Sequence, residues 1–318
     1  MTLIELQEHL IYFNTTADLV GITLYVLYPN ERGEEQIRIA DIDPQSGREL
    51  KTQFLTYLYD KFLRNEGLSF LNISAGDNRK NSAFYYDLEE QPIGLDSMNL
   101  IAQNDVYPQF SFTQDDFNKI KAFIITIGND HRKMILFKNH YHLSVLRGAT
   151  AFGIRISDHR FVRVREDIIK LSPNIDFLQI DNNLIVISLK TLESGFGFDT
   201  IIRNQAALNI LAIEERNLLE DITILTEMAA DIGQAKKIMQ IKRNSPVMRL
   251  PVNAVLTFVT THRPIMKKFK LSADGTRLKL DTKVSRKLFL ALMNDDLLTS
   301  ELTKLYYAGI AKDPMLVE

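Results

Sequence analysis

The sequence predicts an α+β fold, in which an antiparallel β-meander is followed by a mainly helical, basic C-terminal part. Short apolar runs between 123 and 189 alternate with turn residues, as strands joined by tight connections do. After residue 200 the apolar residues recur at helical spacing, and lysine and arginine then gather in one segment. We therefore expect an α+β domain over 1–200 and a mainly helical basic domain over 201–318.

The first half opens with helix-like and strand-like patterns in turn. Residues 2–14 place Leu3, Leu6 and Leu10 at helical spacing, and 49–64 repeat apolar residues four apart. Strand-like segments precede the six runs of the meander. These earlier strands are expected at 21–29, 35–42 and near 83–88, and the meander at 123–129, 132–138, 150–156, 160–166, 176–181 and 184–189.

The second half is predicted to be helical with one strand–turn interruption. The pattern over 207–233 predicts one long amphipathic helix, and Asp274–Gly275 marks a turn between short strands. We expect the last two helices at 283–293 and 299–307.

The composition excludes several chemistries. The chain has 318 residues and no cysteine, which excludes disulfides, cysteine-ligated metals and a thiol nucleophile and fits a reducing cytoplasm. Glu5 and Glu8 stand where a signal peptide would carry basic residues. The apolar runs are shorter than the roughly 20 residues that span a bilayer. We expect a cytoplasmic protein that reaches a membrane only through a partner.

Positive charge is concentrated between residues 234 and 290. This segment holds fourteen lysines and arginines and two aspartates, a net charge of +12, whereas the whole chain carries −2. A segregated positive field attracts polyanions, and lysine-rich ridges without interleaved aromatic residues favour phosphates over bases. We predict sequence-tolerant DNA binding. The expected contact residues are Lys236, Lys237, Lys242, Arg243, Arg263, Lys267, Lys268, Lys270, Lys283, Arg286 and Lys287.

Two other functions stay open from the residues alone. One is a divergent metal-dependent nuclease near Asp176, Asp181 and Glu193, although the strand before Lys190 offers Ser188 where a metal-binding carboxylate would be needed. The other is a protein-interaction module whose basic surface docks an acidic partner.

No complete catalytic or cofactor motif is present. Phosphate-binding loops, dinucleotide fingerprints and nucleophile elbows are missing, so we expect no cofactor and assign no catalytic residue. Four histidines lie close together in sequence, and polar loop residues explain them better than a metal site. They are His131, His140, His142 and His159.

The segment LIVISLKTLESGFGFDT (184–200) joins the last strand to the helical half. We expect Gly195 and Gly197 to act as flexible joints, while Phe196 and Phe198 anchor the junction in the core. Glu193 is a possible functional carboxylate, with capping or pairing to a cation as the alternative.

The same region carries a family resemblance. An Asp-Phe pair, a hairpin turn and an apolar strand precede a Lys-x-x-Glu-x-x-Phe-x-Phe run and, later, the segment LFLALMNDDLLTSELTKLYY. In these features the chain resembles the KwaB family of Kiwa anti-phage defence systems, over residues 115 to 310. The features are Asp176, Phe177, Lys190, Glu193, Phe196, Phe198 and residues 288–307.

The resemblance implies a DNA-binding defence effector. It also implies a homodimer and a small multi-span membrane protein as partner, which would recruit the chain to the inner membrane face.

Overall fold

The chain divides into two compact units, each described by itself. The computed structural model describes residues 1–30, 32–77, 79–103, 106–111, 115, 119–129, 131–140, 145–146, 153–157, 160–164, 168–299 and 306–308. The first unit holds Met1–Phe70, Asn81–Tyr86 and Ile93–Leu192; the second holds Leu71–Lys80, Asp87–Pro92 and Glu193–Glu318. The predicted α+β class is confirmed, with the antiparallel sheet first and the helices second. The domains 1–200 and 201–318 stay a prediction.

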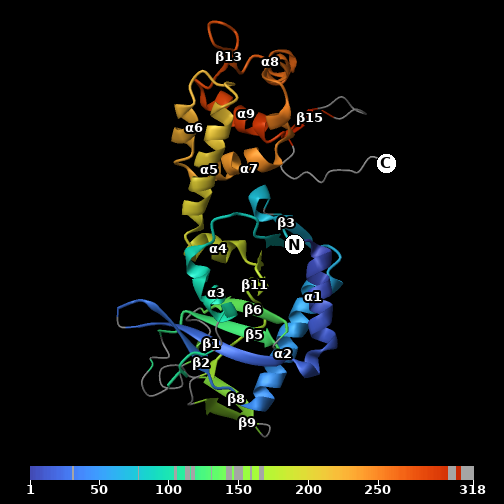
Figure 1. Cartoon of the computed structure of the whole chain (residues 1–318), viewed down its shortest axis with the longest axis vertical. Helices are drawn as coiled ribbons and strands as arrows, with labels where there is room; N and C mark the ends of the chain where they lie inside the picture. Colours follow the sequence, from blue (N-terminus) through green and yellow to red (C-terminus); the bar gives the residue numbers. More distant parts are fainter. Residues whose placement is uncertain are drawn as a thin grey trace. The chain divides into compact units, whose positions relative to one another are not determined.

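The first unit is built on an eight-stranded sheet with the order β2-β1-β5-β6-β11-β12-β4-β3 (Figure 1). The pairs from β2 through to β4 are antiparallel. The strands are β1 (Gly21–Pro29), β2 (Glu35–Ala40), β3 (Ser69–Asn72), β4 (Ser82–Tyr85), β5 (Ala122–Gly128), β6 (Lys133–Asn139), β11 (Phe177–Ile180) and β12 (Asn183–Val186).

The meander prediction is wrong for two of its six runs. β8 (Gly153–Ser157) and β9 (Arg160–Val164) pair with each other in a sheet of their own, as do β7 (Val145–Leu146) and β10 (Ile168–Ile169). The sequence shows that each run is a strand, but pairing between strands depends on contacts that alternation does not specify. β5, β6, β11 and β12 lie side by side as expected.

Helices cover one face of the main sheet. α1 (Leu3–Thr15) and α2 (Pro44–Tyr59) bury Leu10 and Phe54 with Ile125, Leu136 and Leu178 of the strands in one apolar core. α2 begins five residues before the predicted start because the carboxylate of Asp43 accepts hydrogen bonds from Gln45 N and Ser46 N, and Pro44 suits a first helical position.

Shorter helical segments complete the first unit. α3 (Asp96–Gln103) packs against β6, and the amide of Asn99 accepts a hydrogen bond from Gln179 on β11. The remaining turns of helix are η1 (Ala17–Leu19), η2 (Asp60–Arg64), η4 (Ile93–Leu95) and α4 (Leu189–Gly195), the last of which runs across the division between the units.

The second unit is mainly helical. Its core packing pairs α5 with α7, where the buried Asn209 amide donates to the carbonyl oxygens of Ile238 and Met239 at 2.8 and 2.6 Å. The elements are η3 (Ile73–Ala75), α5 (Phe198–Glu214), α6 (Thr223–Met228), α7 (Ile232–Asn244), η7 (Pro246–Arg249), α8 (Val252–Thr261), β13 (Lys270–Leu271), β14 (Leu278–Lys279), α9 (Lys283–Met293), β15 (Leu297–Thr299) and β16 (Tyr306–Ala308).

Two helix predictions in this unit are wrong. The expected helix 207–233 is interrupted after α5, because Asn217 takes a left-handed conformation with φ of 52° and Leu219 then forms a β-bridge with Leu278. The described residues of the expected helix 299–307 belong to strands β15 and β16, which pair with each other, whereas 300–305 lie outside the described residues. Short apolar runs fit either type of element, so periodicity alone could not separate them.

The junction 184–200 behaves largely as its residues indicate. Phe196 and Phe198 are buried, so the predicted anchoring is confirmed. Gly197 precedes α5 with φ of 64°, a conformation that side-chain-bearing residues rarely adopt. Gly195 shows no such φ and a side chain would meet open space there. Only Gly197 therefore requires glycine.

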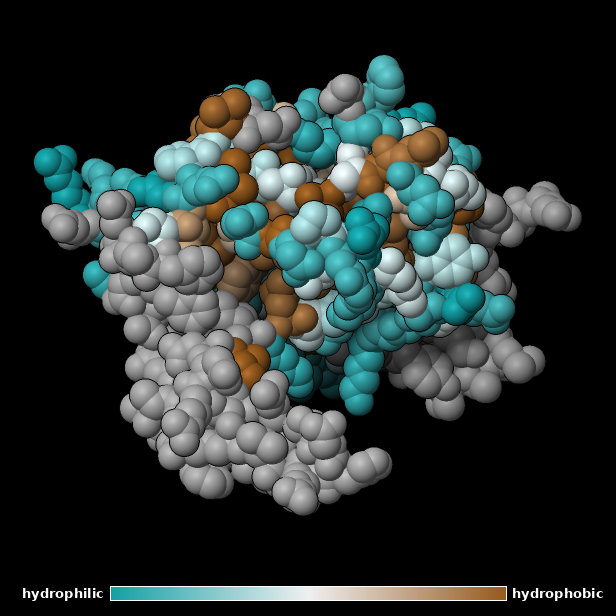
Figure 2. Space-filling model, turned by 90° about the horizontal axis from the view of Figure 1, so that it is seen from below, coloured by the Kyte–Doolittle hydropathy of each residue, from teal (hydrophilic) through white to brown (hydrophobic). Residues whose placement is uncertain are grey.

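The described residues include no helix long and apolar enough to cross a membrane. Over the coloured surface of Figure 2, apolar side chains form separate patches among hydrophilic ones. Such patches are usual on protein surfaces.

Candidate nucleic-acid interface

A basic cavity lies among α6, α7 and α9 in the second unit. It has a volume of about 640 Å³ and is lined by one side of all three helices. Its lining residues are Glu227, Met228, Gly233, Gln234, Lys237, Lys283, Arg286, Lys287 and Leu290. We refer to this space as the basic cavity. It brings four of the eleven predicted contact residues together, although Lys237 and Lys283 are 46 positions apart in the sequence.

The sequence explains how α9 presents its cations. Thr282 and Ser285 form a capping box that begins the helix at Lys283. Phe289 and Met293 on the inner side are buried. Lys283, Arg286 and Lys287 therefore follow one another at i, i+3 and i+4 along the outer side, as predicted. Lys283 and Lys287 are exposed and carry no ion pair to any described residue.

Arg286 is held more firmly than its neighbours. Its Nε donates to the carbonyl oxygen of Leu280 at 3.1 Å, and its Nη1 lies 3.8 Å from a carboxylate oxygen of Glu227. Because Glu227 is two-thirds exposed, this ion pair is weak and leaves the guanidinium able to exchange it for a phosphate.

Two helix beginnings add to the positive field of the basic cavity. Gly233 and Gln234 belong to the first turn of α7, and Lys283 and Arg286 to the first turn of α9. The first turn of a helix exposes backbone N–H groups and carries a partial positive charge. Asp231 Oδ1 accepts the N–H of Gln234 at 2.9 Å, and Thr282 Oγ1 accepts the N–H of Ser285 at 3.0 Å, so one of these groups is already used in each helix. The arrangement suits an anion such as a phosphate.

Two of the predicted contact residues already have carboxylate partners. Lys236 Nζ lies 2.6 Å from Glu193 Oε1, and Lys270 Nζ lies 2.7 Å from Asp281 Oδ2. The hydrogen bond from Lys270 lowers the pKa of Asp281, and the same bond raises the pKa of Lys270. Both lysines are less available to a phosphate than Lys237, which is exposed and has no ion pair among the described residues.

Three predicted contact residues form a second group. Arg263, Lys267 and Lys268 are exposed on the turn that follows α8, and none of them lines the basic cavity. His262 at the end of α8 stacks on Phe258 with 4.4 Å between ring centroids, and its pKa is lowered by burial. We refer to the three cations as the α8 turn. Lys242 and Arg243 lie near the end of α7, and their side chains are outside the described residues.

The carboxylates of the nuclease alternative have separate structural roles. Asp176 is buried, and its carboxylate accepts hydrogen bonds from Asn139 N and from the Thr191 hydroxyl, both at 2.8 Å. Asp181 occupies the β11–β12 turn with φ of 53°, and Glu193 pairs with Lys236. No described group of three or more histidine, aspartate and glutamate residues has the arrangement that holds a metal ion.

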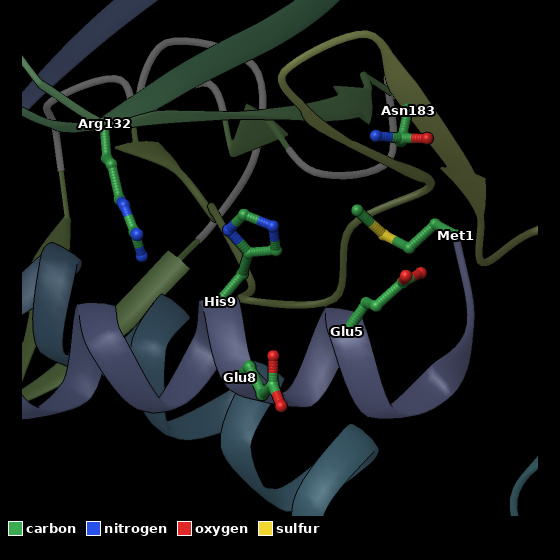
Figure 3. A pocket seen from close by; sticks show the side chains of 6 residues that line it. All are labelled: Met1, Glu5, Glu8, His9, Arg132 and Asn183. Carbon is green, nitrogen blue, oxygen red and sulfur yellow. The ribbon is translucent and has the colours of Figure 1, made fainter.

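A polar pocket beside α1 also contains acidic side chains that do not gather around its histidine. It has a volume of about 480 Å³, and Figure 3 shows the side chains of Glu5, Glu8, His9 and Arg132 around it. Glu5 accepts a hydrogen bond from Thr2 N at 2.7 Å as part of the α1 capping box, and Figure 3 shows Glu8 directed away from His9. The acidic groups therefore do not converge with the imidazole.

The predicted histidine group has no common geometry among its described members. His131 is exposed, and the ring of His140 stands edge-on to Phe123 with 5.3 Å between ring centroids. His142 and His159 lie outside the described residues.

Comparisons with known proteins agree with the resemblance seen in the sequence. The model of the family described as Kiwa protein KwaB-like matches residues 117–303. A curated relative, Kiwa protein KwaB of Escherichia coli O55:H7, is 29% identical over 287 residues, which cover 87% of this chain and 90% of the relative. No solved structure matches the chain at a significant level.

Proposed function

The chain belongs to the Kiwa protein KwaB-like family, and on that premise we propose that it binds duplex DNA without reading its sequence. Membership in this family makes it a component of anti-phage defence. The observation that supports DNA binding is the convergence of Lys237, Lys283, Arg286 and Lys287 on one cavity at the beginnings of α7 and α9.

The chemistry of the basic cavity favours phosphates over base edges. Lysine ammonium groups attract phosphates as point charges, whereas base recognition relies on groups that reach donors and acceptors inside a groove. Its lining residues include no aromatic side chain on which a base could stack. We therefore infer that affinity depends on charge and falls with salt, and that unrelated duplexes bind alike.

The α8 turn extends the proposal to a second group of contacts. Arg263, Lys267 and Lys268 are exposed, so they can meet phosphates without breaking an ion pair to a described residue. We expect them to add to affinity in the same sequence-independent way.

Fluorescence polarisation with two unrelated duplexes of equal length tests the proposal. We expect equal affinities and, for Lys287→Glu, a loss of about tenfold or more, since a charge-assisted contact contributes about 1.5–3 kcal/mol. Arg48→Glu is the matched control, because Arg48 is an exposed cation on α2 with no ion pair to a described residue. Equal losses in both variants, or no loss in either, would contradict a DNA site here and favour an acidic protein partner.

We also propose a homodimer and a small multi-span membrane protein as partners, with recruitment of the chain to the inner membrane face. The support is the family resemblance. Co-expression with a candidate membrane protein and fractionation should move the chain into the membrane fraction; a chain that stays out of it would contradict the recruitment.

A further inference from the structure

The basic cavity combines a buried apolar floor with exposed cations. Met228 and Leu290 line it and are only 4% and 3% exposed. Lys237, Lys283 and Lys287 line it as well, and all three are exposed. The positive charges therefore stand around the opening, while the deepest lining residues are apolar. Such a shape fits one compact anionic group better than it fits a row of phosphates.

The volume of the basic cavity excludes a duplex from its interior. A sphere of about 640 Å³ is roughly 11 Å across, whereas the major groove of B-DNA alone is about 12 Å wide. A duplex that lies against the cavity therefore contacts its rim and leaves the interior unfilled. A single phosphate with its sugar is small enough to enter.

The charge of the lining suits a terminal phosphate. The cations contribute four positive charges, and Glu227 is the one carboxylate among the described lining residues, so the net charge is +3. An internal phosphate of a DNA strand carries one negative charge, whereas a phosphate monoester carries about −1.5 to −2 at pH 7. A monoester at the end of a strand therefore gains more from these converging cations than an internal phosphate does.

Arg286 presents donors that match such a group. Its Nε donates to the carbonyl oxygen of Leu280 at 3.1 Å, which orients the guanidinium and leaves its Nη groups for an anion. Nη1 lies 3.8 Å from Glu227 Oε2, beyond hydrogen-bond distance. A terminal phosphate offers three acceptor oxygens to this fork of donors and carries more charge than the carboxylate of Glu227. It is therefore the stronger competitor for Arg286.

The α8 turn provides a comparison within the same unit. Arg263, Lys267 and Lys268 are exposed there and line no part of the basic cavity. Exposed cations outside a cavity meet internal phosphates of a duplex as readily as terminal ones. The α8 turn should therefore contribute equally to the binding of DNA with and without a terminal phosphate.

We propose that the basic cavity binds the 5′-terminal phosphate of a DNA strand, so that the chain favours duplex ends over duplex interiors. The inference rests on the proposed DNA binding and names the part of the DNA that enters the cavity. The phosphate lies among Arg286 and the three lysines, and the first sugar lies over Met228 and Leu290. A free nucleoside monophosphate shares this phosphate chemistry, so the experiment includes one.

Fluorescence polarisation with two duplexes of one sequence tests the proposal on the full chain. Each duplex is closed at one end by a labelled hairpin loop, and its open end carries either a 5′-phosphate or a 5′-hydroxyl. We expect the phosphorylated duplex to bind about tenfold more tightly, because its end adds charge-assisted hydrogen bonds. Equal affinities would overturn this inference and leave the proposed DNA binding standing. Absence of binding by either duplex would contradict both.

Two variants assign the preference to the basic cavity. Arg286→Gln and Lys287→Gln should each weaken both duplexes and reduce the tenfold ratio to about threefold or less. Arg263→Gln in the α8 turn is the matched control, which should weaken both duplexes by the same factor and keep the ratio. Lys287 is exposed and makes no ion pair to a described residue, so its variant should fold. A ratio that Lys287→Gln leaves at tenfold would overturn the proposal.

Thymidine monophosphate distinguishes a strand end from a free nucleotide. The mononucleotide lacks the other phosphates of a duplex, so it should displace the phosphorylated duplex only at concentrations about 100-fold or more above those at which an unlabelled phosphorylated duplex does. Displacement by both competitors at similar concentrations would assign the cavity to a free nucleotide and overturn the strand-end assignment.

Discussion

Two cavities of the molecule differ in the side chains that line them. The basic cavity is lined by exposed cations on helices, while a cavity of about 800 Å³ over β1, β5, β6 and β11 is lined by the uncharged polar side chains of Thr126 and Gln179. Exposed charges attract any polyanion and are screened by salt, whereas buried hydrogen-bonding groups discriminate between ligands by the cost of an unpaired atom. We therefore expect sequence-tolerant, salt-sensitive binding at the basic cavity of the second unit.

The largest expected effect comes from reversing three charges of the basic cavity. Lys237→Glu, Lys283→Glu and Lys287→Glu together should lower duplex affinity about 10³-fold, because each contact contributes about 1.5 kcal/mol or more. An unchanged duplex affinity in the triple variant would contradict phosphate binding in the basic cavity.

The next largest effect is on the free energy of unfolding. It compares Asp176, whose carboxylate has hydrogen-bond partners, with Thr126, whose hydroxyl has none among the described residues. Asp176→Ala should lower the free energy of unfolding by about 2–4 kcal/mol, because it leaves Asn139 N and the Thr191 hydroxyl without their buried acceptor. Thr126→Val should change it by less than about 0.5 kcal/mol. Urea unfolding measures both.

Asp176→Asn is the control for this contrast, since it retains one carbonyl acceptor and should cost less than the alanine variant. An unfolding cost for Thr126→Val as large as that for Asp176→Ala would show that the Thr126 hydroxyl has a structural role.

The smallest effect concerns Glu193. Its ion pair with Lys236 is about one-third exposed, so Glu193→Gln should cost no more than about 1 kcal/mol of unfolding free energy. Removing the carboxylate frees Lys236 and should raise duplex affinity slightly, up to about threefold. A drop of tenfold or more in duplex affinity, with an unchanged melting temperature, would instead identify Glu193 as a functional carboxylate.

Local signals explain which elements the sequence could predict. Helix α9 lies at 283–293 as predicted because Thr282 caps it and its cations and apolar residues alternate at helical spacing. Strand β1 likewise matches its predicted range. The predicted helix 207–233 is wrong because its break depends on Asn217 and on the bridge from Leu219 to Leu278, a residue far away in the sequence.

The candidate sites likewise combine features that local spacing predicts with features that depend on contacts between distant segments. The ridge on α9 could be predicted from spacing, but its meeting with Lys237 arises from the packing of α7 against α9. The partners of Lys236 and Lys270 could not be seen in a charge count. Thr126 and Gln179 were hidden inside runs that predict buried strands, and only the register aligns them. Their one signal was a polar residue in an otherwise apolar strand.

Salt dependence of duplex binding tests the central claim most directly. The logarithm of the association constant should fall linearly with the logarithm of salt concentration, and the slope should become shallower by about one unit for each of Lys237, Lys283 and Lys287 that is changed to glutamine. The Arg48→Gln control should keep the slope of the unaltered chain. A slope near zero, or one that the three lysine variants do not change, would contradict phosphate binding in the basic cavity.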